Sequence, residues 1–246
     1  MRMDSQNATF FDHLEELRRR ILFILLWFFL CCAISYVFNN QILKLVIQPL
    51  NSFQKSPVFV SPVEPFFSVI KLTLFFGLLL SCPFIFFQIY VFVKPALSIE
   101  QARNFLFCLI AGLVLFYAGI LSGYYFIVPM GLKILFAFGG NLIVPLVTIG
   151  YYLTFFIWIS LMLGIVFQLP VVLAFLGISE IISIGQMKKL RKFVYVGAFV
   201  ISAIITPTTD AITQTIIAGT LIFLYEITLI FLWIFLKHKI LENKNL

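Results

Sequence analysis

The sequence predicts an all-α polytopic membrane protein with six transmembrane helices, the last two of them short, and with both termini in the cytoplasm. Three observations lead to this prediction: the composition, the length of the apolar runs and the distribution of basic residues. Hydrophobic residues make up 62% of the 246 residues and charged residues 11%, and the mean hydropathy is +1.11. A soluble domain is roughly half apolar and about a quarter charged. The composition therefore excludes a soluble enzyme, a disordered chain and a secreted disulfide scaffold.

The apolar runs are long enough to cross a bilayer. A helix needs about 20 apolar residues to cross a hydrocarbon core about 30 Å thick. These runs are apolar on every side, so they lack the alternation of a membrane β-barrel. We interpret the whole chain, residues 1–246, as one membrane domain. The predicted spans are residues 21–38, 69–93, 105–128, 151–176, 193–205 and 212–236.

The basic residues indicate the direction of the chain. With six crossings and the N-terminus inside, 13 of the 17 Lys and Arg residues lie on the cytoplasmic side and 4 lie outside. Membrane proteins concentrate Lys and Arg in their cytoplasmic loops. Both termini are therefore expected inside, and the net charge of +7 requires no nucleic-acid partner.

Residues 9–20 are predicted to form an amphipathic helix that runs into the first span. Apolar residues recur there at the spacing of one helical face, at Phe10, Leu14, Leu17 and Ile21. Glu16 precedes Arg20 by four residues, the favoured order for an ion pair on a helix. Glu15 precedes Arg19 in the same way. The arginines can act as topology anchors with solvated glutamate partners, but orientation alone requires no acidic residue at this boundary.

Two connecting segments have recognisable patterns. Residues 39–68 contain four prolines, which favour a rigid, extended cap on the outer side. Residues 95–103 form a short loop that brings the cytoplasmic ends of the second and third spans together. Ser98 is expected to start the helix that follows this loop.

The fifth run, residues 193–205, is shorter than the others. Its 13 residues reach only about 20 Å as a helix. It forms either a short span that thins the bilayer or one arm of a re-entrant hairpin with the start of the last run. We prefer a short helix pair, because the turn at residues 206–210 is polar enough to lie at an interface.

Several polar side chains lie within or beside the spans, namely Gln88, Gln168, Gln214 and Glu226. Such groups are costly in lipid unless they face protein or water. They either bond to other helices of the chain or line a polar concavity or a subunit contact. The stretch from Gly164 to Pro170 is expected to kink. Gly119 and Gly123 form a G-x-x-x-G pattern, for which packing within the chain is favoured over dimerisation.

No pattern points to covalent chemistry. The two histidines, His13 and His238, lie outside the spans, and zinc-protease, serine-hydrolase, C-x-x-C and Walker A motifs are absent. Catalytic residues, metal ligands and cofactors are therefore not expected. The alternative function is a small-solute secondary transporter with helices broken at Pro83 and Pro170. The lack of an evident internal repeat argues against this alternative.

Several short motifs occur in order along nearly the whole chain. They are His13-Leu14-Glu15-Glu16-Leu17-Arg18-Arg19-Arg20, Gln48-Pro49-Leu50, Pro65-Phe66-Phe67, Pro83, Gln88, Phe92, Pro95-Ala96-Leu97, Phe116-Tyr117-Ala118-Gly119, Thr206-Pro207, Asp210, Gln214 and Glu226. Together they resemble the TatC family, the multispanning subunit of the twin-arginine protein translocase. The resemblance implies six spans with both ends inside.

The resemblance also implies a receptor for signal peptides with paired arginines. Such a receptor helps to move folded proteins across the membrane with the proton-motive force. The residues implied in peptide binding are Glu16, Arg18, Arg20, Phe92, Pro95, Glu100 and Gln101. Carboxylates suit this task because they accept bidentate hydrogen bonds from a guanidinium. This chain departs from the family at the loop glutamate, where it has Gln101 and carries the acid one residue earlier, at Glu100.

Further expectations concern partners and location. The resemblance implies that the last two spans contact TatA- and TatB-like single-span proteins, and that the assembled complex contains several copies of the chain. The residues expected to face partner helices are Gln168, Thr206, Asp210 and Gln214, whereas Pro49, Gln88 and Glu226 are structural or polar groups in the membrane. Gln168 stands where the family often has Glu. The expected location is the bacterial inner membrane, or alternatively a thylakoid or mitochondrial inner membrane.

Overall fold

The computed structural model describes residues 3–53, 56–138, 146–179, 181–206 and 211–242, with side chains described between residues 13 and 234. Within these ranges the chain is helical apart from short connections and one isolated parallel bridge between Val58 and Thr148. The elements are α1 (Met3–Val37), α2 (Asn39–Asn51), α3 (Glu64–Val93), η1 (Lys94–Ala96), α4 (Ile99–Ser122), η2 (Gly123–Ile127), α5 (Val128–Phe138), α6 (Ile149–Val166), α7 (Leu169–Ile178), α8 (Ile184–Ile205) and α9 (Ala211–Glu242).

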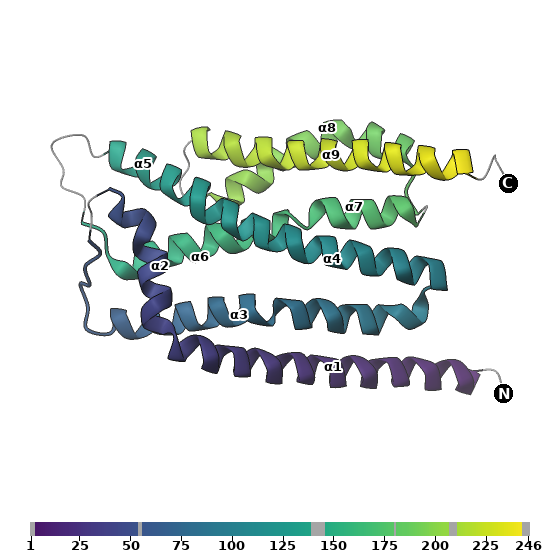
Figure 1. Cartoon of the computed structure of the whole chain (residues 1–246), viewed down its shortest axis with the longest axis horizontal. Helices are drawn as coiled ribbons and strands as arrows, with labels where there is room; N and C mark the ends of the chain where they lie inside the picture. Colours follow the sequence, from purple (N-terminus) through teal and green to yellow (C-terminus); the bar gives the residue numbers. More distant parts are fainter. Residues whose placement is uncertain (1–2, 54–55, 139–145, 180, 207–210, 243–246) are drawn as a thin grey trace.

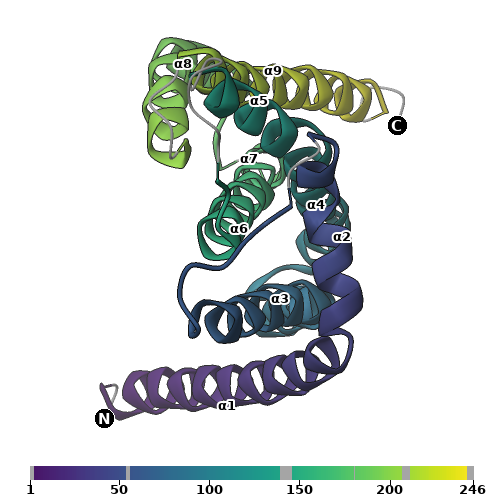
Figure 2. The same cartoon turned by 90° about the vertical axis from the view of Figure 1, so that its left-hand side faces the viewer.

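The long helices are stacked in one direction rather than gathered around a centre. Figures 1 and 2 show α1 at one edge, then α3, then α4 beside α6, then α7, and α8 with α9 at the other edge. At one end of the molecule, α1 begins, α3 turns into α4, α7 leads to α8, and α9 finishes (Figure 1). We call this end the terminal end. The predicted cytoplasmic segments thus lie together at one end.

Five helical stretches in the described part of the chain are long and apolar enough to cross a membrane. They are His13–Val37, Glu64–Ala96, Ile99–Ala137, Ile149–Ile178 and Ala211–Ile234. They overlap the predicted spans other than 193–205, and miss only residue 38 of the first span and residues 235–236 of the last. The run 193–205 lies within α8, which has 22 residues rather than the 13 predicted. The helix begins before the predicted apolar span because basic residues interrupt the apolar pattern without interrupting the helix.

The amphipathic segment runs without a break into the first span in helix α1, as expected. Residues 39–51 form the helix α2, so the prediction of an extended cap was wrong there. The third span continues through a π-helical turn, η2, to Phe138. Pro129 lacks an N–H and its ring crowds the preceding turn, so the wider π turn allows the helix to continue.

The fourth span is broken where the sequence predicted a kink. Helix α6 ends at Val166, and α7 starts at Leu169 with Pro170 in its first turn. The prediction of a kink between Gly164 and Pro170 is therefore confirmed.

Two tyrosines compensate for prolines inside helices. A proline cannot donate to the carbonyl four residues before it, so Pro49 leaves Leu45 O without its helical donor and Pro83 does the same for Leu79 O. The Tyr124 hydroxyl donates to Leu45 O at 2.8 Å, and the Tyr117 hydroxyl donates to Leu79 O at 2.7 Å. Both hydroxyls come from the α4–η2 helix, which therefore holds α2 and α3 in place.

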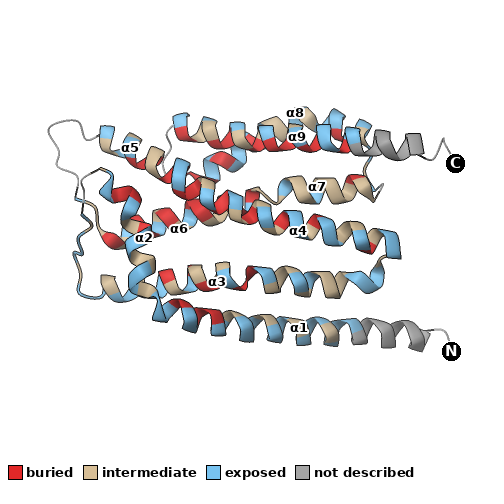
Figure 3. Ribbon diagram, in the orientation of Figure 1, coloured by how far each residue is buried: buried red, intermediate tan, exposed pale blue. Residues whose placement is uncertain are grey.

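Helices α4 and α6 meet closely at glycines. A Cβ atom added at Gly119 would lie 2.7 Å from Leu163 O, and one at Gly123 would lie 3.0 Å from Ser160 Cα. The prediction that the G-x-x-x-G pattern serves packing within the chain is confirmed. In Figure 3 the buried residues lie where α2, α4 and α6 meet and along one face of α9, whereas α1 is mostly exposed. Its exposed side chains, such as Leu26 and Phe29, are apolar and suit contact with lipid.

The connection between α2 and α3 is held to the start of α6. Val58 N donates to Val147 O, and Ile149 N donates to Val58 O, each at 2.9 Å. The Glu64 carboxylate accepts from Gly150 N at 2.7 Å and from Val60 N at 2.9 Å. These bonds satisfy polar groups at the end of the molecule opposite the terminal end.

Candidate functional site

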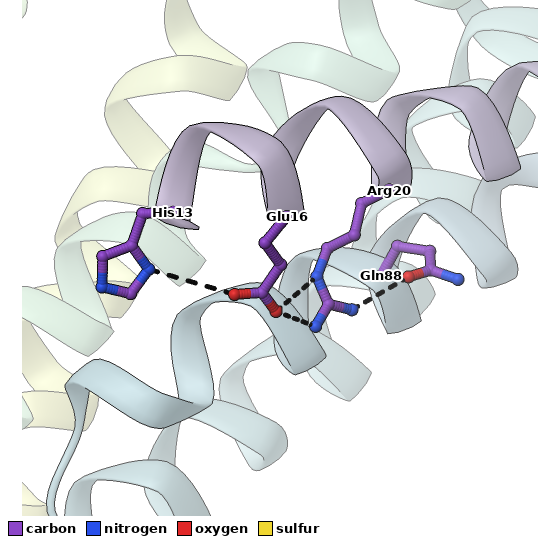
Figure 4. Close-up of polar contacts among 4 residues, drawn as sticks. All are labelled: His13, Glu16, Arg20 and Gln88. Atoms are coloured by element: carbon purple, nitrogen blue, oxygen red, sulfur yellow. Dashed lines mark hydrogen bonds and ion pairs between the residues drawn. The ribbon is translucent and has the colours of Figure 1, made fainter. Parts of the chain in front are cut away.

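A cluster of polar side chains joins α1 to α3 near the terminal end. Arg20 Nε donates to Glu16 Oε1 at 3.1 Å, and Arg20 Nη2 bonds to the same oxygen. Arg20 Nη1 donates to Gln88 Oε1 on α3 at 3.2 Å. His13 Nδ1 lies 3.9 Å from Glu16 Oε2 (Figure 4). The ion pair predicted between Glu16 and Arg20 from their spacing is thus present.

This cluster forms one wall of an open cavity. The cavity has a volume of about 640 Å³ and is lined by Glu15, Glu16, Arg19, Arg20, Phe23, Phe87, Gln88 and Val91. The Glu16 side chain is 34% exposed and the Arg20 side chain 18% exposed, so Glu16 is the more accessible partner. The cavity therefore combines an accessible carboxylate with an apolar wall from both helices.

The second predicted ion pair, between Glu15 and Arg19, is not found among the described residues. The Arg19 guanidinium instead lies 5.7 Å from the centre of the Phe23 ring, a cation–π contact. Both side chains still line the cavity. Removing either one therefore changes the charge of the cavity without disturbing the Glu16–Arg20 pair.

Three other residues assigned to the peptide site do not line this cavity. Arg18 is exposed on α1, Phe92 is half-buried near the end of α3, and Pro95 is exposed in η1. All three lie at the terminal end, on the same two helices or the turn that follows them.

The loop residues Glu100 and Gln101 lie in the first turn of α4. Ser98 caps this helix: Gln101 N donates to Ser98 Oγ at 3.3 Å, and Ser98 N donates to Gln101 Oε1 at 3.1 Å. The predicted helix start at Ser98 is confirmed. The Gln101 carbonyl oxygen is used in this capping box, whereas the Glu100 side chain is exposed.

A second charged cluster lies at the opposite edge of the stack. Arg191 Nη2 on α8 donates to Glu226 Oε2 on α9 at 2.6 Å, and the Tyr195 hydroxyl donates to Glu226 Oε1 at 2.7 Å. Sequence reasoning singled out Glu226 but missed both partners. Arg191 and Tyr195 are four residues apart and so share one face of α8, which was the available signal.

Of the four residues predicted to face partner helices, the three that the structure describes form hydrogen bonds within the chain. Gln168 Nε2 donates to Gly112 O of α4 at 3.0 Å, and Gln214 Nε2 donates to Phe199 O of α8 at 3.2 Å. Thr206 Oγ1 donates to Ser202 O at 3.0 Å. Gln214 nevertheless lines a shallow cavity on α8, and Asp210 lies outside the described residues.

A stack of helices that are long and apolar enough to cross a bilayer, with apolar side chains exposed on its outer face, defines an integral membrane protein. The model of the family described as "Sec-independent protein translocase protein (TatC)" matches residues 12–219. The chain belongs to this TatC family.

Relatives cover almost the whole chain. A "Sec-independent protein translocase protein TatC" from Carboxydothermus hydrogenoformans is 32% identical over 96% of this chain and 97% of its own length. An "Uncharacterized tatC-like protein ycf43" from Gracilaria tenuistipitata var. liui is 36% identical over 93% and 95%. A crystal structure of "Twin Arginine Translocase Receptor- TatC in DDM" has a TM-score of 0.78 and 33% identity, and the match covers 89% of this chain and 98% of that one.

These similarities establish the general function of the chain and its location in a membrane. The chain is a membrane subunit of the Sec-independent, twin-arginine protein translocase, and thus a transport component. Its relatives occur in bacteria and, as ycf43, in plastid genomes.

Proposed function

We propose that this subunit is the receptor for signal peptides with paired arginines, and that Glu16 is the carboxylate that binds one of their guanidinium groups. One observation carries the proposal: Glu16 already accepts two hydrogen bonds from a guanidinium, that of Arg20, in the wall of an open cavity. A carboxylate oriented in this way suits arginine better than lysine, because the planar guanidinium offers two parallel donors.

Peptide binding at this site is an exchange of one guanidinium for another. The Glu16–Arg20 pair lies within one helix, so rotation of the Arg20 side chain is enough to open it. Gln88 accepts from Arg20 Nη1 and can keep this guanidinium after Glu16 releases it. The paired charges of the peptide then enter a cavity that also holds Glu15.

The other peptide contacts lie on the loop at the terminal end. Glu100 supplies a second carboxylate, and Phe92, Pro95 and Arg18 contribute from the same end of the molecule. Gln101 is assigned to capping α4 rather than to the peptide, because its carbonyl oxygen already accepts from Ser98 N.

The wider function requires orientation and partners. We place the terminal end in the cytoplasm and count α8 as the fifth of six crossings, with the proton-motive force as the energy source. TatA- and TatB-like single-span proteins bind along α8 and α9, near Thr206 and Gln214, and several copies of the chain assemble. The transporter alternative is disfavoured, because Gln168 at the helix break bonds to Gly112 O and the cavity beside it has a mainly apolar lining.

The direct test is peptide binding to the purified protein in detergent. A fluorescent signal peptide with two arginines should bind, measured by fluorescence anisotropy. The same peptide with two lysines keeps its charge and should bind at least about tenfold more weakly, since the bidentate contacts are lost. Equal affinity for the two peptides would show that guanidinium recognition is not the function of this site.

A further inference from the structure

The start of α8 carries more positive charge than the surrounding helices neutralise. Lys188, Lys189 and Lys192 are exposed within two turns of one another. Glu226 is the only carboxylate among the described side chains of α7, α8 and α9, and both of its oxygens already accept from Arg191 and Tyr195. The lysines therefore form a cationic surface that the described part of this edge does not balance.

A small slot between α8 and α9 opens beside these lysines. It has a volume of about 160 Å³ and is lined by Lys188 and Arg191 from α8 and by Leu229, Ile230 and Trp233 from α9. The wall from α8 is cationic, and the wall from α9 is apolar. The Arg191 Nε group is buried and donates to no acceptor in the described part of the protein.

The position of the slot matches the edge of a bilayer. The apolar run 193–205 of α8 starts directly after Lys192. Tryptophan is enriched at the level of lipid headgroups, and Trp233 lies at this level on α9, one turn beyond Ile230. The apolar wall continues into the exposed side chains of Ile230 and Trp233, which are 56% and 51% exposed.

We propose that this slot binds one anionic glycerophospholipid. Its phosphate lies against Lys188 and Arg191, and one acyl chain follows Leu229 and Ile230 along α9. Basic pockets between membrane helices favour anionic headgroups. The apolar wall favours a lipid over free phosphate, and the slot is too small for the side of a partner helix.

The bound lipid explains how α8 tolerates four cations so close to its apolar part. Its headgroup supplies the negative charge that the helices lack, and so anchors the start of α8 at the membrane surface. The inference is independent of the peptide site, because no residue is shared between the two.

The test uses the purified full-length protein in detergent and phosphatidylglycerol brominated on one acyl chain. Bromine quenches tryptophan fluorescence at short range, and the signal of Trp233 is the part lost in Trp233→Phe. Brominated phosphatidylglycerol should quench Trp233 in a saturable manner. Brominated phosphatidylcholine, which has no net charge, should require at least about tenfold more lipid, since attraction contributes roughly a factor of five per basic residue.

Two adjacent lysines provide a matched pair of variants. Lys188→Gln removes a charge from the slot and should weaken phosphatidylglycerol binding by about fivefold. Lys189→Gln removes the same charge from outside the slot and should weaken it by less than about twofold. Inorganic phosphate should not compete. Equal effects of the two variants, equal quenching by the two lipids, or displacement by phosphate would each overturn the proposal.

Discussion

Each edge of the helix stack carries a glutamate paired with an arginine, but one pair lies within a helix and the other joins two helices. At the α1 edge, Glu16 pairs with Arg20 of the same helix, and Gln88 adds a neutral contact. At the α9 edge, Glu226 pairs with Arg191 of another helix, and Tyr195 adds a neutral contact. The exposed fractions of the two carboxylate side chains are similar, 34% and 28%.

Connectivity rather than exposure therefore separates the two clusters. A pair within one helix opens by side-chain rotation and leaves the helices in place. A pair between two helices opens only if the helices separate or a charge is left unpaired beside lipid. The α1 cluster can exchange its guanidinium for that of a ligand, whereas the α9 cluster is a structural cross-link.

The largest expected effect is on stability at the α9 edge. Glu226→Leu leaves Arg191 without its carboxylate and should lower the free energy of unfolding by about 2 kcal/mol. This loss is smaller than that for breaking a fully buried ion pair, because both groups are partly exposed. Thermal unfolding in detergent measures this loss. The double variant Arg191→Leu/Glu226→Leu should recover more than half of it. An unchanged melting temperature in Glu226→Leu would contradict the cross-link.

The next effect concerns the carbonyl freed by Pro83. Tyr117→Phe removes the donor to Leu79 O and should cost about 1–2 kcal/mol in unfolding free energy, because a carbonyl is left unsatisfied. Adding Pro83→Ala restores a backbone N–H and should reduce the cost of Tyr117→Phe. Tyr125→Phe is the control, because Tyr125 is 64% exposed. Equal losses for the two tyrosine variants would argue against this compensation.

At the α1 edge, removing the internal guanidinium should strengthen peptide binding. Arg20→Gln frees Glu16. The affinity for the paired-arginine peptide should rise about two- to fivefold, which corresponds to the free energy of a partly exposed ion pair. Arg19→Gln is the control for net charge, because it removes the same charge but leaves the Glu16–Arg20 pair intact. Anisotropy titrations of both variants decide the matter. If Arg19→Gln tightens binding as much, Arg20 does not compete for Glu16.

The smallest expected effects distinguish the role of Glu100 from that of Gln101. Gln101→Ala breaks the capping box and should cost about 0.5 kcal/mol in stability, with peptide affinity unchanged. Glu100→Gln keeps the capping box and should weaken peptide binding about threefold. Melting temperatures and titrations on the same samples test both. The opposite pattern would place Gln101 rather than Glu100 at the peptide.

Local patterns in the sequence predicted most parts of the site that depend on one helix, although the Glu15–Arg19 pair predicted in the same way is not found among the described residues. The Glu16–Arg20 pair follows from spacing, the helix start at Ser98 follows from its capping residues, and the kink near Pro170 follows from the missing N–H. These features need no knowledge of how the helices pack. The sequence therefore predicted them without a structure.

Features that join distant parts of the chain were not predicted. The Arg191–Glu226 pair depends on the rotation of two helices about their axes, and no local pattern records that rotation. Residues 39–68 were expected to form a rigid, extended cap because they contain four prolines, yet residues 39–51 are helical. The helix forms because Tyr124, 79 residues from Leu45, supplies the missing donor.

The most direct test of the account compares Glu16→Gln with Glu15→Gln. Both variants remove one carboxylate from the same cavity and keep the shape of the side chain, but only Glu16 holds a guanidinium. Glu16→Gln should reduce the affinity for the paired-arginine peptide at least about tenfold, because charge-assisted hydrogen bonds are lost. Glu15→Gln should reduce it by less than about threefold, and both variants should unfold at the parental temperature. Parental affinity in a folded Glu16→Gln protein would contradict the proposed receptor site.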